Sequence, residues 1–515
     1  MYTISNRLKT FSIILIVLGI LGVTYGFVTS HKSLDEVKHM LEEEHSAHGG
    51  GHSAPTEAHV VAGDENHADN KHQLEANDTL ADMDVTEHHS EAVDTHTTQT
   101  DADSLHMADS AHDEDNTSMS HSEDTTSGYG EVNHDGPDAH GDANEHAEHV
   151  QEQLAKRPWS ALYVAAFFFM MIALGALAFY AIQFAAQAGW SPLLFRVMEG
   201  ITAYLLPGAI IVVAIALGSH FIGHHNEIFI WMNEDVVKDD ELIQGKSGWL
   251  NITGFIIRAI IFIGGWSLYR HFARKFSIAQ DNADEGDNRN FKKSFRIAAG
   301  FLVFYIYTES MMAWDWIMSV DPHWFSTLFG WYVFASMIVS AVTVIAMVTM
   351  YLKGKGLLPQ VNNSHIHDLA KFMFGFSIFW TYLWFSQFML IWYSNIPEEV
   401  TYFITRIEDY RLPFFGMLVL NFIFPLLMLM NSDYKRINWF VIMAGIVILF
   451  GHYIDIFNMI MPATVGDRWF IGIPEIGSIL LFGGLFLFIV FTALTKAPLV
   501  AKRNPFIHES EHFHY

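Results

Sequence analysis

Ten stretches of this sequence are long and apolar enough to cross a lipid bilayer as helices. A hydrocarbon core of about 30 Å needs roughly 20 apolar residues in a helix, because lipid offers the backbone no hydrogen-bond partners. The predicted spans are 11–28, 159–186, 199–220, 249–269, 295–318, 329–351, 370–393, 411–430, 437–461 and 472–494. We therefore expect an all-α integral membrane protein with ten transmembrane helices.

A long acidic stretch separates the first predicted span from the second. Residues 31–150 contain 30 Asp or Glu, 3 Lys, no Arg and 18 His, and their net charge of −27 equals that of the whole chain. High net charge with few aromatic or branched residues buries too little surface to offset chain entropy. We predict a disordered insert at 31–157, after a first transmembrane helix at 1–30 and before a nine-helix membrane domain at 158–495 and a tail at 496–515.

The first span could be a cleaved signal peptide or a retained anchor. Arg7 and Lys9 precede its apolar run, as in a signal peptide, but no A-x-A-like cleavage site follows Val28. We interpret it as a retained anchor.

Lys and Arg residues in short loops predict the orientation, because cytoplasmic loops are enriched in both. They gather after the fourth, sixth, eighth and tenth predicted spans. These four segments share one side of the membrane if every span crosses it. The sequence therefore predicts that both termini are cytoplasmic and that the acidic insert lies outside.

Histidines in the insert allow two interpretations. His45, His48 and His52, or the pair His88 and His89, could bind Zn²⁺ or Cu²⁺ weakly. The alternative, which we favour, is a solvated spacer whose imidazoles also buffer protons. We assign no metal site to the chain.

The chain contains no cysteine. It therefore has no disulfide, no thiolate-ligated iron–sulfur cluster and no C-x-x-C-H haem attachment. A haem held by two histidines is also disfavoured, since His220 is predicted at the end of the third span and His452 lies deeper in the ninth. We expect no cofactor held by this chain, apart from a quinol as a candidate ligand, and no nucleic-acid partner.

Ionisable side chains inside the predicted spans are the candidates for chemistry, because a charge in hydrocarbon is costly and usually marks a pair, a ligand site or a pathway. Arg258 and Glu309 fall at similar depth in neighbouring spans, so we predict that they pair. His452 and Asp455 are three residues apart and share one helical face, and Asp315 lies closer to the outer surface. These five residues could form a proton relay. The alternative is a set of buried contacts that fixes helix packing.

Three segments carry a family resemblance. They are AWDWIMSVDPHWFSTLFGWY at 313–332, YLWFSQFMLIWYSNIPEE at 382–399, and GHYID at 451–455 with Met461-Pro462 beyond it. They closely resemble signatures of the large membrane subunits of bacterial alternative complex III, a quinol:cytochrome c or quinol:electron-carrier oxidoreductase. From the first to the last, they extend over most of residues 295–470.

The resemblance has several implications. Those subunits are similar to the NrfD/polysulfide-reductase membrane family, which implies two four-helix bundles plus two further helices in a bacterial cytoplasmic membrane. It implies a sister NrfD-like membrane subunit, a multihaem c-type cytochrome subunit and an iron–sulfur subunit as partners. Haem c and iron–sulfur clusters would belong to those partners. A terminal oxidase is left open as a further partner.

The region after the third span indicates which subunit the chain resembles. Family members that oxidise quinol tend to carry a His-Leu-Gly-Arg-like element there. The stretch from Gly218 to Glu227 keeps histidines and lacks the arginine. Together with the large insert, this departure favours the subunit called ActF.

Three functions remain open from the residues. We favour a cofactor-free subunit that supports assembly and proton translocation and is not catalytic alone. The alternative is direct oxidation of menaquinol or ubiquinol near the periplasmic leaflet, with His220 or His224 as proton acceptor. A metal permease is the least favoured, because the spans contain a single His-x-x-Asp.

Overall fold

All regular structure in the described part of the chain is helical. The computed structural model describes residues 2–48, 139–223 and 226–514. Within these residues, ten helices are long and apolar enough to cross a membrane. This confirms the number of predicted spans and the position of each, and the chain is a multi-pass membrane protein.

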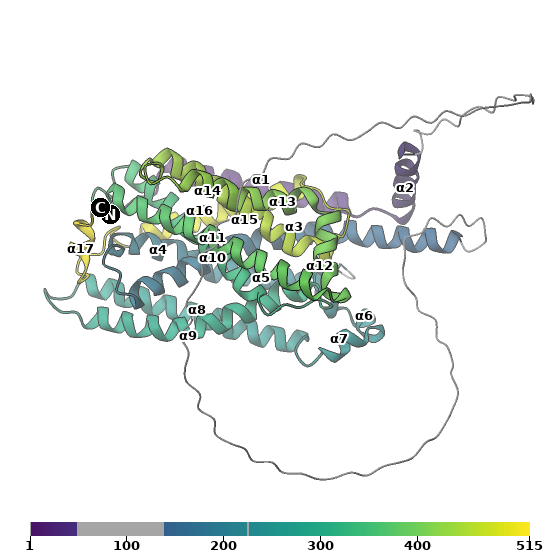
Figure 1. Cartoon of the computed structure of the whole chain (residues 1–515), viewed down its shortest axis with the longest axis horizontal. Helices are drawn as coiled ribbons and strands as arrows, with labels where there is room; N and C mark the ends of the chain where they lie inside the picture. Colours follow the sequence, from purple (N-terminus) through teal and green to yellow (C-terminus); the bar gives the residue numbers. More distant parts are fainter. Residues whose placement is uncertain (1, 49–138, 224–225, 515) are drawn as a thin grey trace, which may run out of the picture. The chain divides into compact units, whose positions relative to one another are not determined.

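Eight of the ten spans are single helices, and two are interrupted (Figure 1). The third span consists of α4 (Phe195–Ile201) and α5 (Leu205–Phe221) joined by a 3₁₀ turn, and the eighth of α13 (Arg411–Leu418) and α14 (Phe424–Leu429) joined by a π-helical turn, Val419–Ile423. The others are α1 (Asn6–Ser30), α3 (Ala139–Ala185), α8 (Ile252–Asp281), α9 (Arg289–Trp316), α10 (Phe329–Gly354), α11 (Asn363–Ser394), α15 (Asn438–Val465) and α16 (Ile473–Leu494).

Both chain termini lie at the same end of the helix array, as an even number of crossings requires (Figure 1). The ring of Tyr2 lies 6.4 Å from that of Phe491 near the end of α16, and Asn362, just before α11, donates a hydrogen bond of 2.6 Å to the carbonyl of Phe513. We call this end the terminal face and the other the distal face. Short helices lie at both, α17 (Ile507–Glu511) at the terminal face and α2 (Leu34–His48), α6 (Glu234–Asp239), α7 (Glu241–Gly245) and α12 (Pro397–Glu408) at the distal face.

Both ends of the predicted insert are helical, which corrects the predicted boundaries 31–157. α2 occupies one end, and the first turns of α3 occupy the other. Val37 of α2 is buried against Ala147 and Val150 of α3. Because the stretch as a whole is highly charged, its sequence did not reveal the small apolar contact between α2 and α3. The predicted disorder of residues 49–138 lies outside the described residues.

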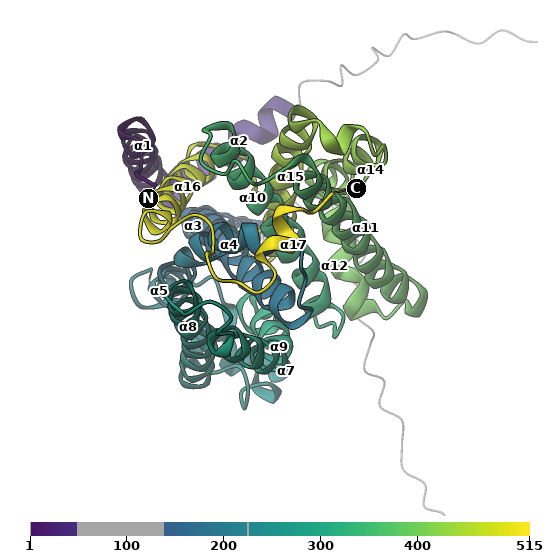
Figure 2. The same ribbon diagram turned by 90° about the vertical axis from the view of Figure 1, so that its left-hand side faces the viewer.

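α3 and α10 occupy the interior of the array. Almost all residues of their apolar segments are buried, whereas α1, α8 and α11 carry large exposed apolar side chains. Figure 2 views the array along its helices, with α3, α4 and α10 between the outer helices. A helix that is apolar all round belongs in the interior, and exposed apolar faces belong against lipid or a partner chain.

α1 packs against α16 through glycines (Figure 2). A Cβ atom added to Gly19 would lie 2.3 Å from the backbone nitrogen of Leu481, and one added to Gly477 would lie 2.9 Å from the backbone of Gly22. Small residues let the backbones of membrane helices approach closely, and that approach supplies the packing energy that water cannot supply in lipid.

We expect Gly19→Leu to force α1 away from α16. The unfolding free energy of the purified chain in detergent should fall by about 1–3 kcal/mol in a denaturant titration. Gly264→Leu in α8 is the matched control, because no described atom beyond its own turn of helix lies within 4 Å of a Cβ atom placed there. Equal stability of the two variants would show that the glycine contact does not hold α1 in place.

Candidate functional site

His452 and Asp455 lie in the middle of α15 and are completely enclosed. Both side chains are 0% exposed. His452 is about 20 Å from either end of the helix at 1.5 Å per residue. Its Nδ1 atom lies 3.5 Å from Asp455 Oδ2, which confirms that the two side chains share a helical face.

Asp455 accepts hydrogen bonds from two neighbouring helices. Ser336 Oγ of α10 and Trp380 Nε1 of α11 lie 2.8 and 2.9 Å from Oδ2, and the hydroxyl of Tyr332, also from α10, donates to Oδ1. Three donors on one carboxylate offset much of the cost of burying it. The carboxylate therefore ties α10, α11 and α15 together.

The same network sets the histidine tautomer. Ser336 Oγ lies 2.8 Å from His452 Nδ1 as well as from Asp455. A hydroxyl has one proton, so when Ser336 donates to Asp455 the imidazole donates from Nδ1. Nε2 is then the bare nitrogen. It has no hydrogen-bond partner among the described residues.

Further buried polar atoms near the cluster also lack partners within the described part of the chain. They are both side-chain polar atoms of Asn421, Oδ1 of Asn458 and Nε2 of Gln387. A Cβ atom at Gly451 would lie 2.1 Å from Asn421 Oδ1, so Asn421 reaches α15 beside His452 because residue 451 is glycine. Asn421 belongs to the π-helical turn, a distortion frequent at functional sites. Such atoms commonly bind water in native proteins.

Arg258 pairs with Asp315, so the predicted Arg258–Glu309 pair is wrong. Arg258 Nε lies 2.5 Å from Asp315 Oδ2, and the indole of Trp249 donates to Oδ1 at 2.7 Å. Side chains of a helix tilt toward its N-terminus. α8 begins at the distal face, so the guanidinium reaches toward that face and meets Asp315 in the last turn of α9. Equal depth of the Cα atoms of Arg258 and Glu309 was therefore the wrong criterion.

Glu309 belongs to neither cluster. It is 3% exposed, and its Oε2 atom lies 3.5 Å from Ser310 Oγ. Its Oε1 atom has no hydrogen-bond partner in the described residues. The five candidate relay residues thus occupy three places, which are the His452–Asp455 cluster, the Arg258–Asp315 pair and Glu309.

Of the two candidate quinol-binding histidines, the structure describes His220. His220 lies in the last turn of α5 at the distal face, and its Nδ1 atom is 3.4 Å from Glu227 Oε1. The side chains are 21% and 8% exposed. His224 lies outside the described residues. Direct quinol oxidation at these histidines stays a prediction.

An ion pair joins two loops at the distal face. His323 Nε2 lies 2.5 Å from Asp240 Oδ2, and Asp240 also caps α7 by accepting hydrogen bonds from the backbone of Leu242 and Ile243. The Ile243 amide, followed by His323, lowers the pKa of the Asp240 carboxyl below its usual range. This carboxylate fixes the loop after α9 against the junction of α6 and α7.

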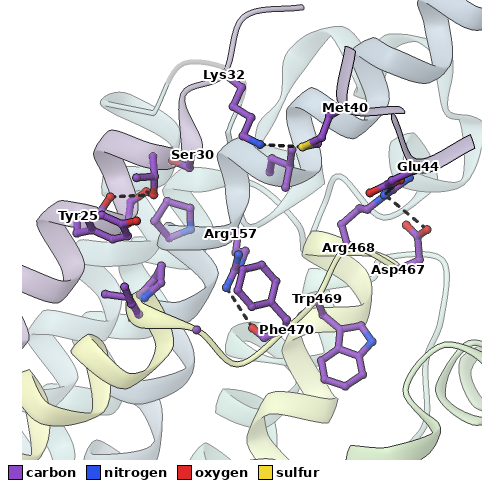
Figure 3. A pocket seen from close by; sticks show the side chains of 17 residues that line it. Tyr25, Ser30, Lys32, Met40, Glu44, Arg157, Asp467, Arg468, Trp469 and Phe470 are labelled. Atoms are coloured by element: carbon purple, nitrogen blue, oxygen red, sulfur yellow. Dashed lines mark hydrogen bonds and ion pairs between the residues drawn. The ribbon is translucent and has the colours of Figure 1, made fainter. Parts of the chain in front are cut away.

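A cavity of about 620 Å³ at the distal face is lined by Arg157 and Arg468, two arginines whose ion pairs sequence reasoning missed (Figure 3). Arg157 of α3 lies over the ring of Phe470, 3.2 Å from its centroid, and its Nε atom is 2.8 Å from Glu475 Oε1 at the start of α16. Arg468 in the same cavity is 2.8 Å from Glu44 Oε2 of α2. Charged residues at a span end are common, so nothing in the sequence singled them out.

A second missed network lies near the terminal face. Arg196 Nη1 is 2.8 Å from Glu199 Oε2, and Arg196 also pairs with Asp281. Ser277 Oγ donates to Glu199 Oε1 at 2.6 Å, and Arg274 Nη1 lies 3.3 Å from Glu199 Oε2. Arg196 and Glu199 are each at most 3% exposed, although they fell at a predicted span boundary. The sequence signal for this pair was an Arg and a Glu three residues apart within an apolar segment.

No group of three or more His, Asp or Glu side chains in the described ranges is placed to hold a metal ion. Of the predicted histidine clusters, His52, His88 and His89 lie outside the described residues, as do the side chains of His45 and His48.

We expect Arg258→Met to lower the unfolding free energy by about 3–5 kcal/mol, because it leaves Asp315 buried without its cation. Combining it with Asp315→Leu should recover a large part of that loss. Arg289→Met is the control, since Arg289 pairs with Asp287 with its side chain 85% exposed. Denaturant titration in detergent measures all three. Equal effects of the Arg258 and Arg289 variants would contradict a buried pair.

The comparisons with known proteins leave the family open. No protein-family model matches this chain, and no curated protein matches it. The resemblance to alternative complex III therefore rests on the three segments themselves. Two of them, distant in the sequence, meet where Tyr332 donates to Asp455.

Proposed function

We propose that this chain is a cofactor-free membrane subunit of a quinol-oxidising respiratory complex of the alternative complex III type. In this proposal it supports assembly of the complex and moves protons through the polar cluster around Asp455. It is not catalytic alone, and haem c and iron–sulfur clusters belong to its partner subunits.

The cluster of His452, Asp455, Ser336, Tyr332 and Trp380 is the observation that carries the proposal. Titratable groups at the centre of a membrane span are costly and are characteristic of proton relays and ion pathways. Here an imidazole, a hydroxyl, a carboxylate and a phenol are linked within hydrogen-bond distance. Each can accept one proton and release another, which is the requirement for a relay.

Polar groups extend from the cluster toward both faces. On the distal side, a small cavity lined by Tyr332, Gln387 and Asn458 follows the carboxylate. On the terminal side, Ser340 and Thr343 of α10 continue the line of Ser336 at helical spacing, and both are 0% exposed. Water bound to the partnerless atoms would complete a path between these groups.

The resemblance supports the same assignment. Tyr332 belongs to the first resembling segment, Gln387 to the second, and His452 with Asp455 to the third. The first and third segments meet in the cluster, and the second lines the small cavity beside it, as the parts of one functional signature would. The contacts among α10, α11, α13, α14 and α15 suit one of the two implied four-helix bundles, and α1 and α16 suit the further pair. The contacts of α8 with α5 and α9 suit the other bundle, which α3 joins through the hydrogen bond from Tyr163 to the carbonyl of Trp316 in α9.

The proposal includes location and partners. The terminal face is cytoplasmic in a bacterial inner membrane, and the acidic insert is periplasmic. The exposed apolar faces of α8, α9 and α11 contact lipid and a sister membrane subunit.

Purification of the tagged chain from its native membranes in mild detergent tests the assembly. We expect c-type haem and an iron–sulfur subunit to co-purify and the haem to be reduced by added quinol. A preparation that contains the chain alone, with no haem and no quinol-dependent haem reduction, would contradict the proposal.

Proton transfer is tested with His452→Ala in the assembled complex, reconstituted into vesicles. We expect proton release per quinol oxidised to fall by about tenfold or more, because the relay loses its imidazole. Ser336→Ala should have a similar effect, since Ser336 bridges His452 and Asp455. His271→Ala, an exposed histidine of α8, is the control. Undiminished proton release from a His452→Ala complex with full haem content contradicts the relay.

A further inference from the structure

Glu309 lines a cavity that the proton path does not use. The cavity has a volume of about 180 Å³ and lies between α9 and α10, with one side closed by Ile182 of α3. Glu309 is seven residues from the end of α9, about 10 Å below the distal end of the helix. Glu309 therefore lies within the distal half of the spanning region, and the cavity extends from it toward mid-helix at Leu302.

The walls of the cavity are aromatic and aliphatic. Tyr305, Trp331 and Phe334 supply rings, and Leu302 and Ile306 supply branched side chains. Ile306 and Trp331 are 45% and 44% exposed on the outer surface of two spanning helices. A molecule dissolved in the bilayer can therefore reach the cavity from the lipid side.

The carboxyl of Glu309 is the polar feature that needs a partner. Ser310 has one hydroxyl proton, and its shorter contact, 3.2 Å, is to the carbonyl of Ile306. Tyr305 donates to the sulfur of Met337. Oε1 of Glu309 thus remains without a partner among the described residues, although the side chain is 3% exposed. A buried polar atom in this state is costly unless a ligand completes it.

Water and lipid tails are poor occupants. A water molecule needs two to four polar partners, and apolar cavities of about this size stay dry but accept a single aromatic ring. An acyl chain would fill the volume and leave Glu309 without a hydrogen bond. A lipid with four fused rings exceeds the volume.

We propose that this cavity binds the head group of a lipid-soluble ring that carries hydroxyl or carbonyl oxygens, of the quinone class. The ring lies among Tyr305, Trp331 and Phe334, an oxygen of the ring hydrogen-bonds Glu309, and the apolar tail leaves past Ile306 into the bilayer. The choice of a quinone over other single-ring lipids rests on the function proposed above. The site is a binding site, and no electron transfer is assigned to it.

The test uses the full complex in phosphatidylcholine nanodiscs and a decyl-benzoquinone that carries a photoactivatable diazirine. We expect label on residues of α9 and α10 around Glu309, suppressed by excess unlabelled decylubiquinone. Label spread over the exposed residues of α1, α8 and α11 at the same density, or not suppressed by the competitor, would show lipid partitioning and overturn the site.

Substitutions in the cavity wall test the site directly. Ile306→Trp fills the mouth and should reduce labelling about tenfold or more. Val303→Trp is the matched control, because Val303 is on the same helix, 63% exposed and not part of the cavity wall. Glu309→Leu should weaken the apparent affinity about tenfold and Glu309→Gln much less, since an amide keeps a hydrogen bond. Full labelling of the Ile306→Trp protein would overturn the proposal, and the competition experiment on the native protein holds even if a variant misfolds.

Haem content and proton release of the same preparation report separately on the function proposed above. Absence of label from a complex that retains both overturns the cavity site alone. Specific label on a chain that purifies without haem retains the site and overturns the respiratory assignment.

Discussion

The hydrogen bonds to the Asp455 carboxylate are the interactions on which the membrane domain depends most. The carboxylate is completely buried within α15, and it accepts hydrogen bonds from α10 and α11. In hydrocarbon, apolar side chains gain little by choosing each other over lipid, so directional polar contacts decide which helices meet and in what register. One carboxylate thereby fixes three helices.

Charges are distributed along the helices according to depth. Arg157 with Glu475 and Arg258 with Asp315 lie toward the distal face, and the Arg196–Glu199 network lies toward the terminal face. Near the ends, guanidinium groups find carboxylates within reach. At mid-depth the partners of Asp455 are neutral or titratable donors, an arrangement suited to moving a proton without moving a full buried cation.

Buried polar atoms that lack a hydrogen-bond partner among the described residues occur at both proposed sites. Asn421, Asn458 and Nε2 of His452 gather beside one another around α15, and Glu309 stands apart at a cavity open to lipid. The first group suits water and protons, because many polar atoms converge there. The second suits an organic ring, because one polar atom faces an apolar wall. The ligands proposed for the two places differ for this reason.

The sequence by itself determined that ten helices cross the membrane, because backbone hydrogen bonds must be satisfied within each apolar segment regardless of neighbours. It also determined that His452 and Asp455 share a face, since their spacing follows from helix geometry alone. It predicted that Arg258 and Glu309 pair, and it missed the helix hidden in the acidic stretch. Partners across helices depend on rotation and tilt. Tertiary packing set those quantities, turned Arg258 toward Asp315, brought Tyr332 to Asp455 and left Glu309 facing an empty volume.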